Sequence, residues 1–288
     1  MKTFQSQGQT IRQPNSVFTD LNTSFQQAMS YVILSRVTSL NQLYLTKFDT
    51  KKIYCNKLAK REAGNLRARA INCITTDWDQ KQNNQLNISS LNVRSLQQHL
   101  KDLKADEFIM KSDILCVQET WLDSDPDDHL LGYHAYYLHG RSRGIAIFTR
   151  LSPVATQNFQ SDICSIIKSS FDEFDLVNIY RAHSNMNLDQ FREEILPFVD
   201  VSRTQIMIGD FNINLLKTPQ NALTSTLQQL GYRQLVMKPT HNQGGLIDHV
   251  YFFSPNNFVT CDLFKYHTVF WSDHTCQSLI LKFSDKQL

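Results

Sequence analysis

The stretch QIMIGDFNI, residues 205–213, decides how this sequence folds and where its chemistry lies. A short apolar run ends at Gly209, and an acid and an amide, Asp210 and Asn212, follow two residues apart. A run of this kind predicts a buried strand. Since residues two apart on extended chain share a face, we expect Asp210 and Asn212 to point into one cleft. A Gly-Asp pair after an apolar run is also typical of a plain turn, so the rest of the chain must decide between the two.

The composition is that of a globular protein without an obvious membrane segment. Its 288 residues hold 29 Lys and Arg against 27 Asp and Glu, a net charge of +2, and offer room for one large or two smaller domains. No apolar run approaches the ~20 residues of a membrane helix, and the polar start shows no signal peptide. Because the six cysteines lack C-x-x-C spacing, we expect reduced, buried thiols and an intracellular setting, cytosolic or nuclear.

Residues 85–288 read as a strand-rich domain with a few helices between the strands. Strand-like runs lie at 86–91, 114–117, 133–138, 145–149, 176–180, 206–208, 246–253, 261–267 and 279–283. Helical spacing of apolar residues occurs at 96–108, 188–196 and 222–230. This order predicts an α/β fold in which sheets pack face to face with helices outside.

Polar side chains recur where these apolar runs end: Asn92, Glu119, Tyr180, Asp210 with Asn212, Asp248, and Asp273 with His274. Taken singly, each could have only a structural role, as a cap, a surface acid, a half-buried aromatic or a loop residue. No structural requirement, however, places carboxylates, amides and imidazoles repeatedly at the ends of strands. Carboxylate and amide oxygens suit a hard cation such as Mg²⁺, whereas zinc needs Cys or several His at ligand spacing. With an imidazole that donates to a phosphate oxygen, the set predicts metal-assisted attack on a phosphodiester.

Five short motifs in this region resemble the ordered motifs of the endonuclease/exonuclease/phosphatase superfamily, and most of all its retrotransposon-type, apurinic-like endonucleases. They are NVRSL at 92–96, QETWL at 118–122, GDFN at 209–212, LIDH at 246–249 and SDH at 272–274. The resemblance implies a four-layer α/β sandwich, in which two packed mixed β-sheets are flanked by helices. It also implies an Mg²⁺-dependent DNA endonuclease, with Mn²⁺ as the alternative ion, that nicks a strand to leave a 3′-hydroxyl.

By position, the resemblance implies a metal site in which Glu119 is the metal carboxylate and Asn92 assists it. Asp273 sits beside the metal or supports the network. Members that repair abasic sites carry a second acid where this chain has Arg94, and Lys where it has Trp121. These two departures favour the transposon branch over dedicated repair.

The resemblance also implies the catalytic roles. Asp210 orients and activates the attacking water, and Asn212 contacts the scissile phosphate. His274 binds and polarises that phosphate, with Asp248 as its orienting partner. Tyr180 falls where the family keeps a tyrosine that contacts the phosphate or the leaving group.

Four arginines are candidate DNA contacts: Arg94, Arg141, Arg143 and Arg181. Plain surface arginines are the alternative. Two other functions also stay open. The same fold acts on phosphoinositides or nucleotides in some members, and a decayed transposon copy would leave a DNA-binding module without activity.

Residues 1–56 carry a second, smaller resemblance. SQGQT at 6–10 and YVILSRVTS at 31–39 resemble the last two motifs of Pif1-type superfamily-1 DNA helicases. The resemblance implies coupling of nucleotide state to DNA by Gln7 and Gly8, and an arginine finger at Arg36. Because no G-x-x-x-x-G-K-S/T loop is present to hold nucleotide phosphates, we expect a helicase remnant without ATPase activity.

Residues 57–84 then read as a basic, polar linker. Helitron-like transposons join such a helicase to an endonuclease in this order. The two resemblances together imply a transposon polyprotein whose helicase portion is missing here, with DNA as its partner and the nucleus as its location.

Overall fold

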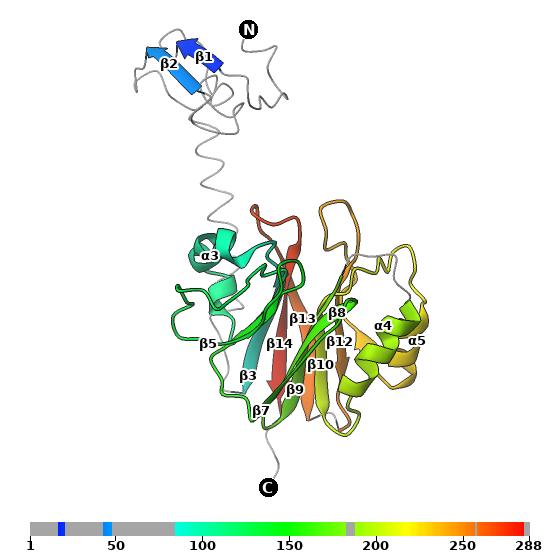
Figure 1. Ribbon diagram of the computed structural model, residues 1–288. Coiled ribbons are helices and arrows are strands. Elements are labelled where there is room, and N and C mark those ends of the chain that lie inside the picture. Colours follow the sequence, from blue (N-terminus) through cyan, green and yellow to red (C-terminus); the bar gives the residue numbers. More distant parts are fainter. Residues whose placement is uncertain (1–16, 21–42, 48–83, 183–187, 257, 285–288) are drawn as a thin grey trace, which may run out of the picture. The chain divides into compact units, whose positions relative to one another are not determined.

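The computed structural model describes residues 17–20, 43–47, 84–182, 188–256 and 258–284 (Figure 1). The chain divides into two compact units, residues 1–81 and 82–288. In the first unit, β1 (Val17–Asp20) pairs in parallel with β2 (Leu43–Lys47). Gln7, Gly8 and Arg36 lie outside the described residues, and so does nearly all of the predicted linker.

The second unit is built on two six-stranded sheets. The first has the order β13-β14-β3-β4-β6-β5. Its strands are β3 (Gln85–Asn92), β4 (Ile114–Gln118), β5 (His134–Leu138), β6 (Ile145–Thr149), β13 (Val259–Thr268) and β14 (Thr275–Phe283). The second has the order β11-β12-β10-β9-β8-β7. Its strands are β7 (Ala155–Gln160), β8 (Cys164–Ser170), β9 (Phe174–Arg181), β10 (Thr204–Asp210), β11 (Arg233–Gln234) and β12 (Asp248–Phe253).

Helices lie on the outer sides of the sheets (Figure 1). They are α3 (Leu96–Ala105), α4 (Leu188–Ile195) and α5 (Ala222–Gln229), with short 3₁₀ turns η5 (Ile109–Lys111) and η6 (Leu196–Phe198). Both sheets are mixed, because β3 and β4 run parallel, as do β9 and β10, while the other pairs are antiparallel. The predicted α/β arrangement of two packed mixed sheets with flanking helices is confirmed.

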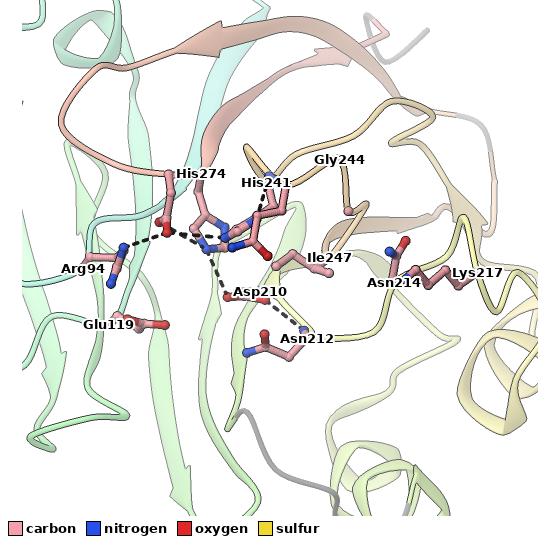
Figure 2. A pocket seen from close by; sticks show the side chains of 13 residues that line it. Arg94, Glu119, Asp210, Asn212, Asn214, Lys217, His241, Gly244, Ile247 and His274 are labelled. Carbon is pink, nitrogen blue, oxygen red and sulfur yellow. Dashed lines mark hydrogen bonds and ion pairs between the residues drawn. The ribbon is translucent and has the colours of Figure 1, made fainter. Parts of the chain in front are cut away.

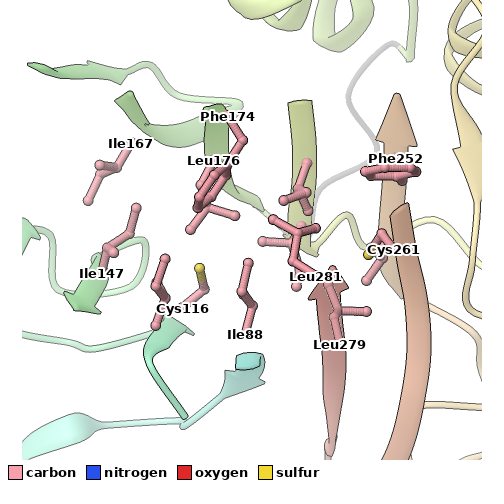
Figure 3. Close-up of a cluster of buried hydrophobic side chains, with 14 of the residues drawn as sticks. Ile88, Cys116, Ile147, Ile167, Phe174, Leu176, Phe252, Cys261, Leu279 and Leu281 are labelled. Atoms are coloured by element: carbon pink, nitrogen blue, oxygen red, sulfur yellow. The ribbon is translucent and has the colours of Figure 1, made fainter. Parts of the chain in front are cut away.

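The side chains of β10 alternate between two cores, as strand geometry requires. Ile206 and Ile208 enter the apolar layer between the sheets, which also holds Ile88 and Leu279 of the first sheet (Figure 3). Met207 faces the opposite way, into the core shared with α4 and α5. The strand is therefore buried on both faces, which explains its continuous apolar sequence.

Four cysteines of the described chain (Cys116, Cys164, Cys261 and Cys276) are buried, free thiols, as predicted for them. Within the same residues, no helix has both the length and the apolar character needed to cross a bilayer.

One edge of the sandwich gathers the predicted site residues. The parallel strands β3 and β4 end there together, with Asn92 opposite Gln118. In the second sheet Asp210 pairs with Tyr180 of β9 on one side and with Asp248 of β12 on the other. The expectation that Asp248 and His274 follow their strands was wrong. Asp248 begins β12 and His274 directly precedes β14, and each reaches this edge because its strand runs antiparallel to a neighbour.

Candidate active site

A cleft of about 560 Å³ opens at this edge (Figure 2). The predicted residues that line it are Arg94, Glu119, Asp210, Asn212, Asp273 and His274. Asn92, Tyr180 and Asp248 are buried, and their side chains hydrogen-bond to the lining residues. The structure thus brings together nine predicted site residues from two sheets.

The loops of the site hold the backbone in a conformation that non-glycine residues rarely adopt. In the described chain, left-handed φ angles at non-glycine residues occur only at Arg94, Ser95, Glu119, Trp121 and Asn212. Such backbone costs free energy, and it persists where surrounding contacts over-determine it, often at functional sites. Here it turns the chain sharply at the ends of β3, β4 and β10.

Gly209 is required by close packing of two strands. Its φ is +141°, and a Cβ added there would lie 1.9 Å from the carbonyl oxygen of Ile179 on β9. No side chain can be accommodated against a backbone atom at that distance. Glycine therefore lets β10 approach β9 and delivers Asp210 next to Tyr180.

Asn92 connects the two sheets. Its Nδ2 donates to Oε1 of Glu119 and to Oδ2 of Asp210, each at 2.9 Å. The hydroxyl of Tyr180 donates to the same Oε1 at 3.1 Å, so neither bond uses Oε2 of Glu119. Burial, and then the nearby charges of Glu119 and Asp210, raise the pKa of Tyr180, which keeps its hydroxyl a hydrogen-bond donor.

Asp210 is fixed by donors to both of its oxygens. Oδ2 accepts from Asn92, and Oδ1 accepts from the backbone N–H of Asn212 at 2.9 Å. Burial and the charge of Asp248 raise the pKa of Asp210 to about 7, against the lowering effect of His274. A carboxylate with a pKa near 7 is suited to accept a proton at neutral pH.

The segment after Asp210 is both a turn and part of the site. β10 ends at Asp210, and Asn212 has φ 49°, so the extended conformation does not persist to Asn212. The two residues share the cleft through this turn, in which the Asn212 N–H caps the Asp210 carboxylate. The hydrogen bond from the Asn212 N–H to the Asp210 carboxylate therefore both stabilises the turn and orients a site residue.

His274 is held as a cation by Asp248. Its Nδ1 lies 3.0 Å from Oδ1 and 2.9 Å from Oδ2 of Asp248. Burial alone would lower the pKa of His274, but Asp248, and then Asp210 and Asp273, outweigh it and raise the pKa to about 10. With Nδ1–H donating to Asp248, Nε2–H is left on the cleft side, 3.9 Å from Oδ2 of Asp210.

Asp273 forms the other wall of the cleft. Its Oδ2 accepts from Nη1 of Arg94 at 2.7 Å and lies 3.4 Å from Nε2 of His241. Its Oδ1 is buried and has no hydrogen-bond partner among the described residues. The loop is anchored by Ser272, whose Oγ donates to the carbonyl of Asn92 at 2.7 Å.

His241 is a site residue that the sequence analysis missed. It lines the cleft and forms an isolated antiparallel bridge with His274. The centres of the two imidazole rings lie 4.9 Å apart, and the angle between the ring planes is 84°. The available signal was the polar segment THNQGG at 240–245, directly before the LIDH motif. Lys217 and Asn214 also line the cleft and carried no comparable signal.

The donor atoms fit a hard divalent cation. Among the residues that the structure describes, two groups of three side chains could hold a metal ion: His241, Asp273 and His274, and Asp210, Asp248 and His274. The second group is already satisfied by the buried His274–Asp248 ion pair. Oxygen ligands suit Mg²⁺ best, and the structure offers Oε2 of Glu119 and the unpartnered Oδ1 of Asp273. We therefore favour Glu119 and Asp273, assisted by Asn92, as the ligands of a hard cation over the two groups that include His274.

The predicted DNA-contacting arginines occupy different environments. Arg94 lines the cleft. The side chain of Arg141 is 87% exposed and pairs with Asp123, and Arg143 donates to the carbonyl of Ser161 at 2.7 Å. Arg141 and Arg143 lie on the turn between β5 and β6. Their contact with DNA stays a prediction.

Arg181 does not line the cleft. The residue is 5% exposed, and its Nη1 donates to the carbonyl of Asn212 at 3.2 Å. In return, Nδ2 of Asn212 donates to the Arg181 carbonyl at 2.7 Å. The guanidinium also lies 5.5 Å from the ring centre of Phe191 on α4. Arg181 therefore supports the turn at Asn212 from inside the protein, because burial removes it from the surface where DNA would bind.

The sequence profile of the Endonuclease/Exonuclease/phosphatase family matches residues 86–274. The chain belongs to this family, and its fold is the family's hydrolase fold of nuclease and phosphatase type.

Solved structures with the same fold include an AP endonuclease from Archaeoglobus fulgidus, with 20% identity, a TM-score of 0.53, and coverage of 69% of this chain and 99% of that one. A 3′-5′ exonuclease (NExo) from Neisseria meningitidis shows 18% identity, a TM-score of 0.52, and coverage of 69% and 100%. An endonuclease/exonuclease/phosphatase family protein from Leptotrichia buccalis shows 14% identity, a TM-score of 0.50, and coverage of 69% and 100%. No curated protein sequence matches the chain.

Proposed function

We propose that this chain is an Mg²⁺-dependent DNA endonuclease that hydrolyses a phosphodiester bond with a water activated by Asp210. One observation carries the proposal. Hydrogen bonds join Tyr180, Glu119, Asn92 and Asp210 across the two sheets, and the His274–Asp248 pair lies beside them, with Nε2 of His274 3.9 Å from Oδ2 of Asp210.

Asp210 has the position and the proton affinity of the general base. Both of its oxygens are held by donors, which fixes the direction of the carboxylate. With a pKa of about 7, it is available to accept a proton from water at neutral pH. Asn212 lines the same cleft, where it would contact the scissile phosphate.

His274 supplies positive charge where negative charge develops. Its pKa of about 10 keeps the ring protonated at neutral pH. Nδ1–H is occupied by Asp248, so Nε2–H is the donor left for a phosphate oxygen. A preorganised donor of this kind stabilises the transition state more than the ground state.

Glu119 and Asp273 would hold the divalent cation, with Asn92 and Tyr180 orienting Glu119 through its Oε1. When bound, Mg²⁺ supplies Lewis-acid stabilisation of the phosphate and the leaving oxygen. Mn²⁺ accepts the same oxygen ligands and is the expected substitute.

DNA is the substrate we propose, and positive side chains at the cleft support this. Arg94 and Lys217 line the cleft and offer contacts to phosphates. We also propose that the nick serves transposition in the nucleus and that a helicase portion belongs to the same polyprotein. The motif resemblance in residues 92–96 and 118–122, and the helicase-like motifs of residues 1–56, support this wider setting.

A plasmid-nicking assay tests the proposal. Wild-type protein with Mg²⁺ should convert supercoiled plasmid to open circles, EDTA should stop the reaction, and a polymerase should extend the 3′-hydroxyl that is left. Asp210→Ala and His274→Ala should lose nicking, while Arg192→Gln, on the outer helix α4, should keep it. Equal nicking by all proteins would overturn the site assignment.

Two other outcomes would replace the proposed substrate. Release of phosphate from phosphoinositides or nucleotides, with plasmid left intact, would identify a phosphatase on the same fold. Binding of DNA without any hydrolysis would identify a decayed binding module.

A further inference from the structure

Arg94 and the proposed cation depend on the same carboxylate. Nη1 of Arg94 lies 2.7 Å from Oδ2 of Asp273, and Asp273 is one of the two acids that the proposed function assigns to the metal. A guanidinium paired with a metal ligand lowers the negative charge available to the metal and repels the metal itself. Two cations therefore compete for Asp273.

We propose that Arg94 and the divalent cation use Asp273 in turn, and that a DNA phosphate draws Arg94 away from Asp273, so that DNA and metal bind cooperatively. This inference rests on the proposed function. It makes Arg94 a positioning residue that acts through Asp273 on the order in which substrate and metal assemble.

The geometry allows Arg94 to move without moving the loop. The backbone of Arg94 is fixed, since its N–H donates to Oδ1 of Asn92 at 3.1 Å. Its side chain is 49% exposed and reaches Asp273 from solvent. Ion pairs this exposed are weak, and a guanidinium fork matches the oxygens of a phosphate.

The surroundings of Asp273 allow its carboxylate to exchange Arg94 for a cation. Its side chain is 20% exposed, and its Oδ1 has no hydrogen-bond partner in the described chain. Nε2 of His241 lies 3.4 Å from Oδ2, and Nε2 of His274 lies 3.9 Å from Oδ1. Departure of Arg94 would therefore free Oδ2 from its ion pair, while the buried Oδ1 has no hydrogen-bond partner among the described residues that would compete with a cation.

Linkage makes the inference quantitative. If DNA raises the affinity for metal by removing Arg94 from Asp273, metal must raise the affinity for DNA by the same factor. Deleting the guanidinium should remove this coupling and leave the free protein with the higher metal affinity.

The first experiment measures Mn²⁺ binding to DNA-free protein by electron paramagnetic resonance of the unbound ion. Arg94→Gln should bind Mn²⁺ roughly fivefold more tightly than wild type, which is the factor expected from losing one exposed ion pair. Arg192→Gln is the matched control, because it removes an arginine paired with Asp189 and Glu193 on α4, and it should bind Mn²⁺ like wild type. A purely structural role for Arg94 predicts weaker binding, which is the opposite sign.

The second experiment measures DNA affinity by fluorescence anisotropy, with Asp210→Asn present in every protein to prevent cleavage and ionic strength held constant. Mg²⁺ should tighten DNA binding roughly fivefold in the parent and leave it nearly unchanged in the Arg94→Gln protein. Equal Mn²⁺ affinities in the first experiment, or equal Mg²⁺ effects in the second, would overturn the inference alone. Failure of every protein to bind Mn²⁺ would overturn the proposed function, and this inference with it.

Discussion

The substitution Asp248→Asn gives the sharpest test of the charge on His274. It preserves the shape of the side chain but removes the carboxylate that lies 2.9 and 3.0 Å from Nδ1 of His274. Without that charge, the lowering effect of burial meets less opposition and the pKa of His274 falls, so a smaller fraction of the ring is protonated at neutral pH.

The size of the effect follows from the pKa. Raising the pKa of His274 from 6.5 to about 10 corresponds to roughly 5 kcal/mol in favour of the charged ring. Removing Asp248 also relieves its repulsion of Asp210, which offsets part of this loss. We expect Asp248→Asn to lower the free energy of unfolding by about 3 kcal/mol, near the lower end for a broken buried ion pair.

The pH dependence has a definite sign. A pKa that is higher in the folded state gives stability that is fully present below the unfolded value of 6.5 and is lost as pH rises through about 10. The difference in unfolding free energy between wild type and Asp248→Asn should therefore be largest below pH 6.5 and shrink towards pH 10. Urea unfolding across this range measures it, with Asp262→Asn as a control, because that acid forms only an exposed pair with Lys282.

Activity should follow the same charge. Nicking by Asp248→Asn at neutral pH should fall roughly 100- to 1000-fold, as when one transition-state donor is lost. The double variant Asp248→Asn/His274→Ala should be no slower than His274→Ala alone, because the two residues act as a unit. Three results would each contradict this prediction: nicking by Asp248→Asn at the wild-type rate, a difference in unfolding free energy that does not change with pH, or a double variant slower than His274→Ala by the full loss seen for Asp248→Asn.

Three further substitutions test the supporting contacts. Burial lowers the pKa of His249 to about 4, so wild type should lose up to about 3 kcal/mol between pH 6.5 and 4, as the unfolded chain takes up the proton. His249→Gln should lack this loss, and an equal decrease in the free energy of unfolding of the two proteins between pH 6.5 and 4, measured by urea unfolding, would contradict it. Tyr180→Phe removes the donor to Glu119 and should lower nicking about tenfold with a higher Mg²⁺ requirement; an unchanged Mg²⁺ titration would count against it. Gly209→Ala would set a methyl group 1.9 Å from the carbonyl of Ile179 and should cost at least about 3 kcal/mol, and a wild-type melting temperature would contradict that.

The sequence predicted the parts of the site that local pattern controls. The apolar run before Asp210 is a buried strand because both faces of β10 are covered, and Asn92 and Glu119 follow strands that end at one edge. Ser95 caps α3, with its Oγ accepting from the backbone N–H of Gln98 at 3.3 Å. These features need only a few neighbouring residues to be recognised.

What the sequence did not predict depends on long-range pairing. Antiparallel partners decide that Asp248 and His274 enter the site from the starts of their strands, and no local pattern carries that information. Burial of Arg181 depends on Phe191 and Asn212, which come from separate segments. His241 reaches the cleft through one bridge to a residue far along the chain. Pairing over such distances is set by the packed fold, so the sequence marked Asp248 and His274 as candidates without the way they enter the site, and it did not mark His241.

The site also explains why the two sheets must dock in a single register. The first sheet contributes Asn92, Glu119 and His274, and the second contributes their partners. Among the site residues, three hydrogen-bonded contacts cross between them: Asn92 to Asp210 at 2.9 Å, Tyr180 to Glu119 at 3.1 Å, and His274 to Asp248 at 2.9 Å.

Apolar contacts between the sheets tolerate small shifts, because the hydrophobic effect has no direction. A buried polar group that loses its partner is costly, so a displaced register would leave acids and amides unsatisfied at this edge. The same contacts that hold Asp210 and His274 in their proposed catalytic positions therefore also select the native packing. We therefore expect substitutions at these positions to change the packing of the sandwich as well as the proposed catalysis.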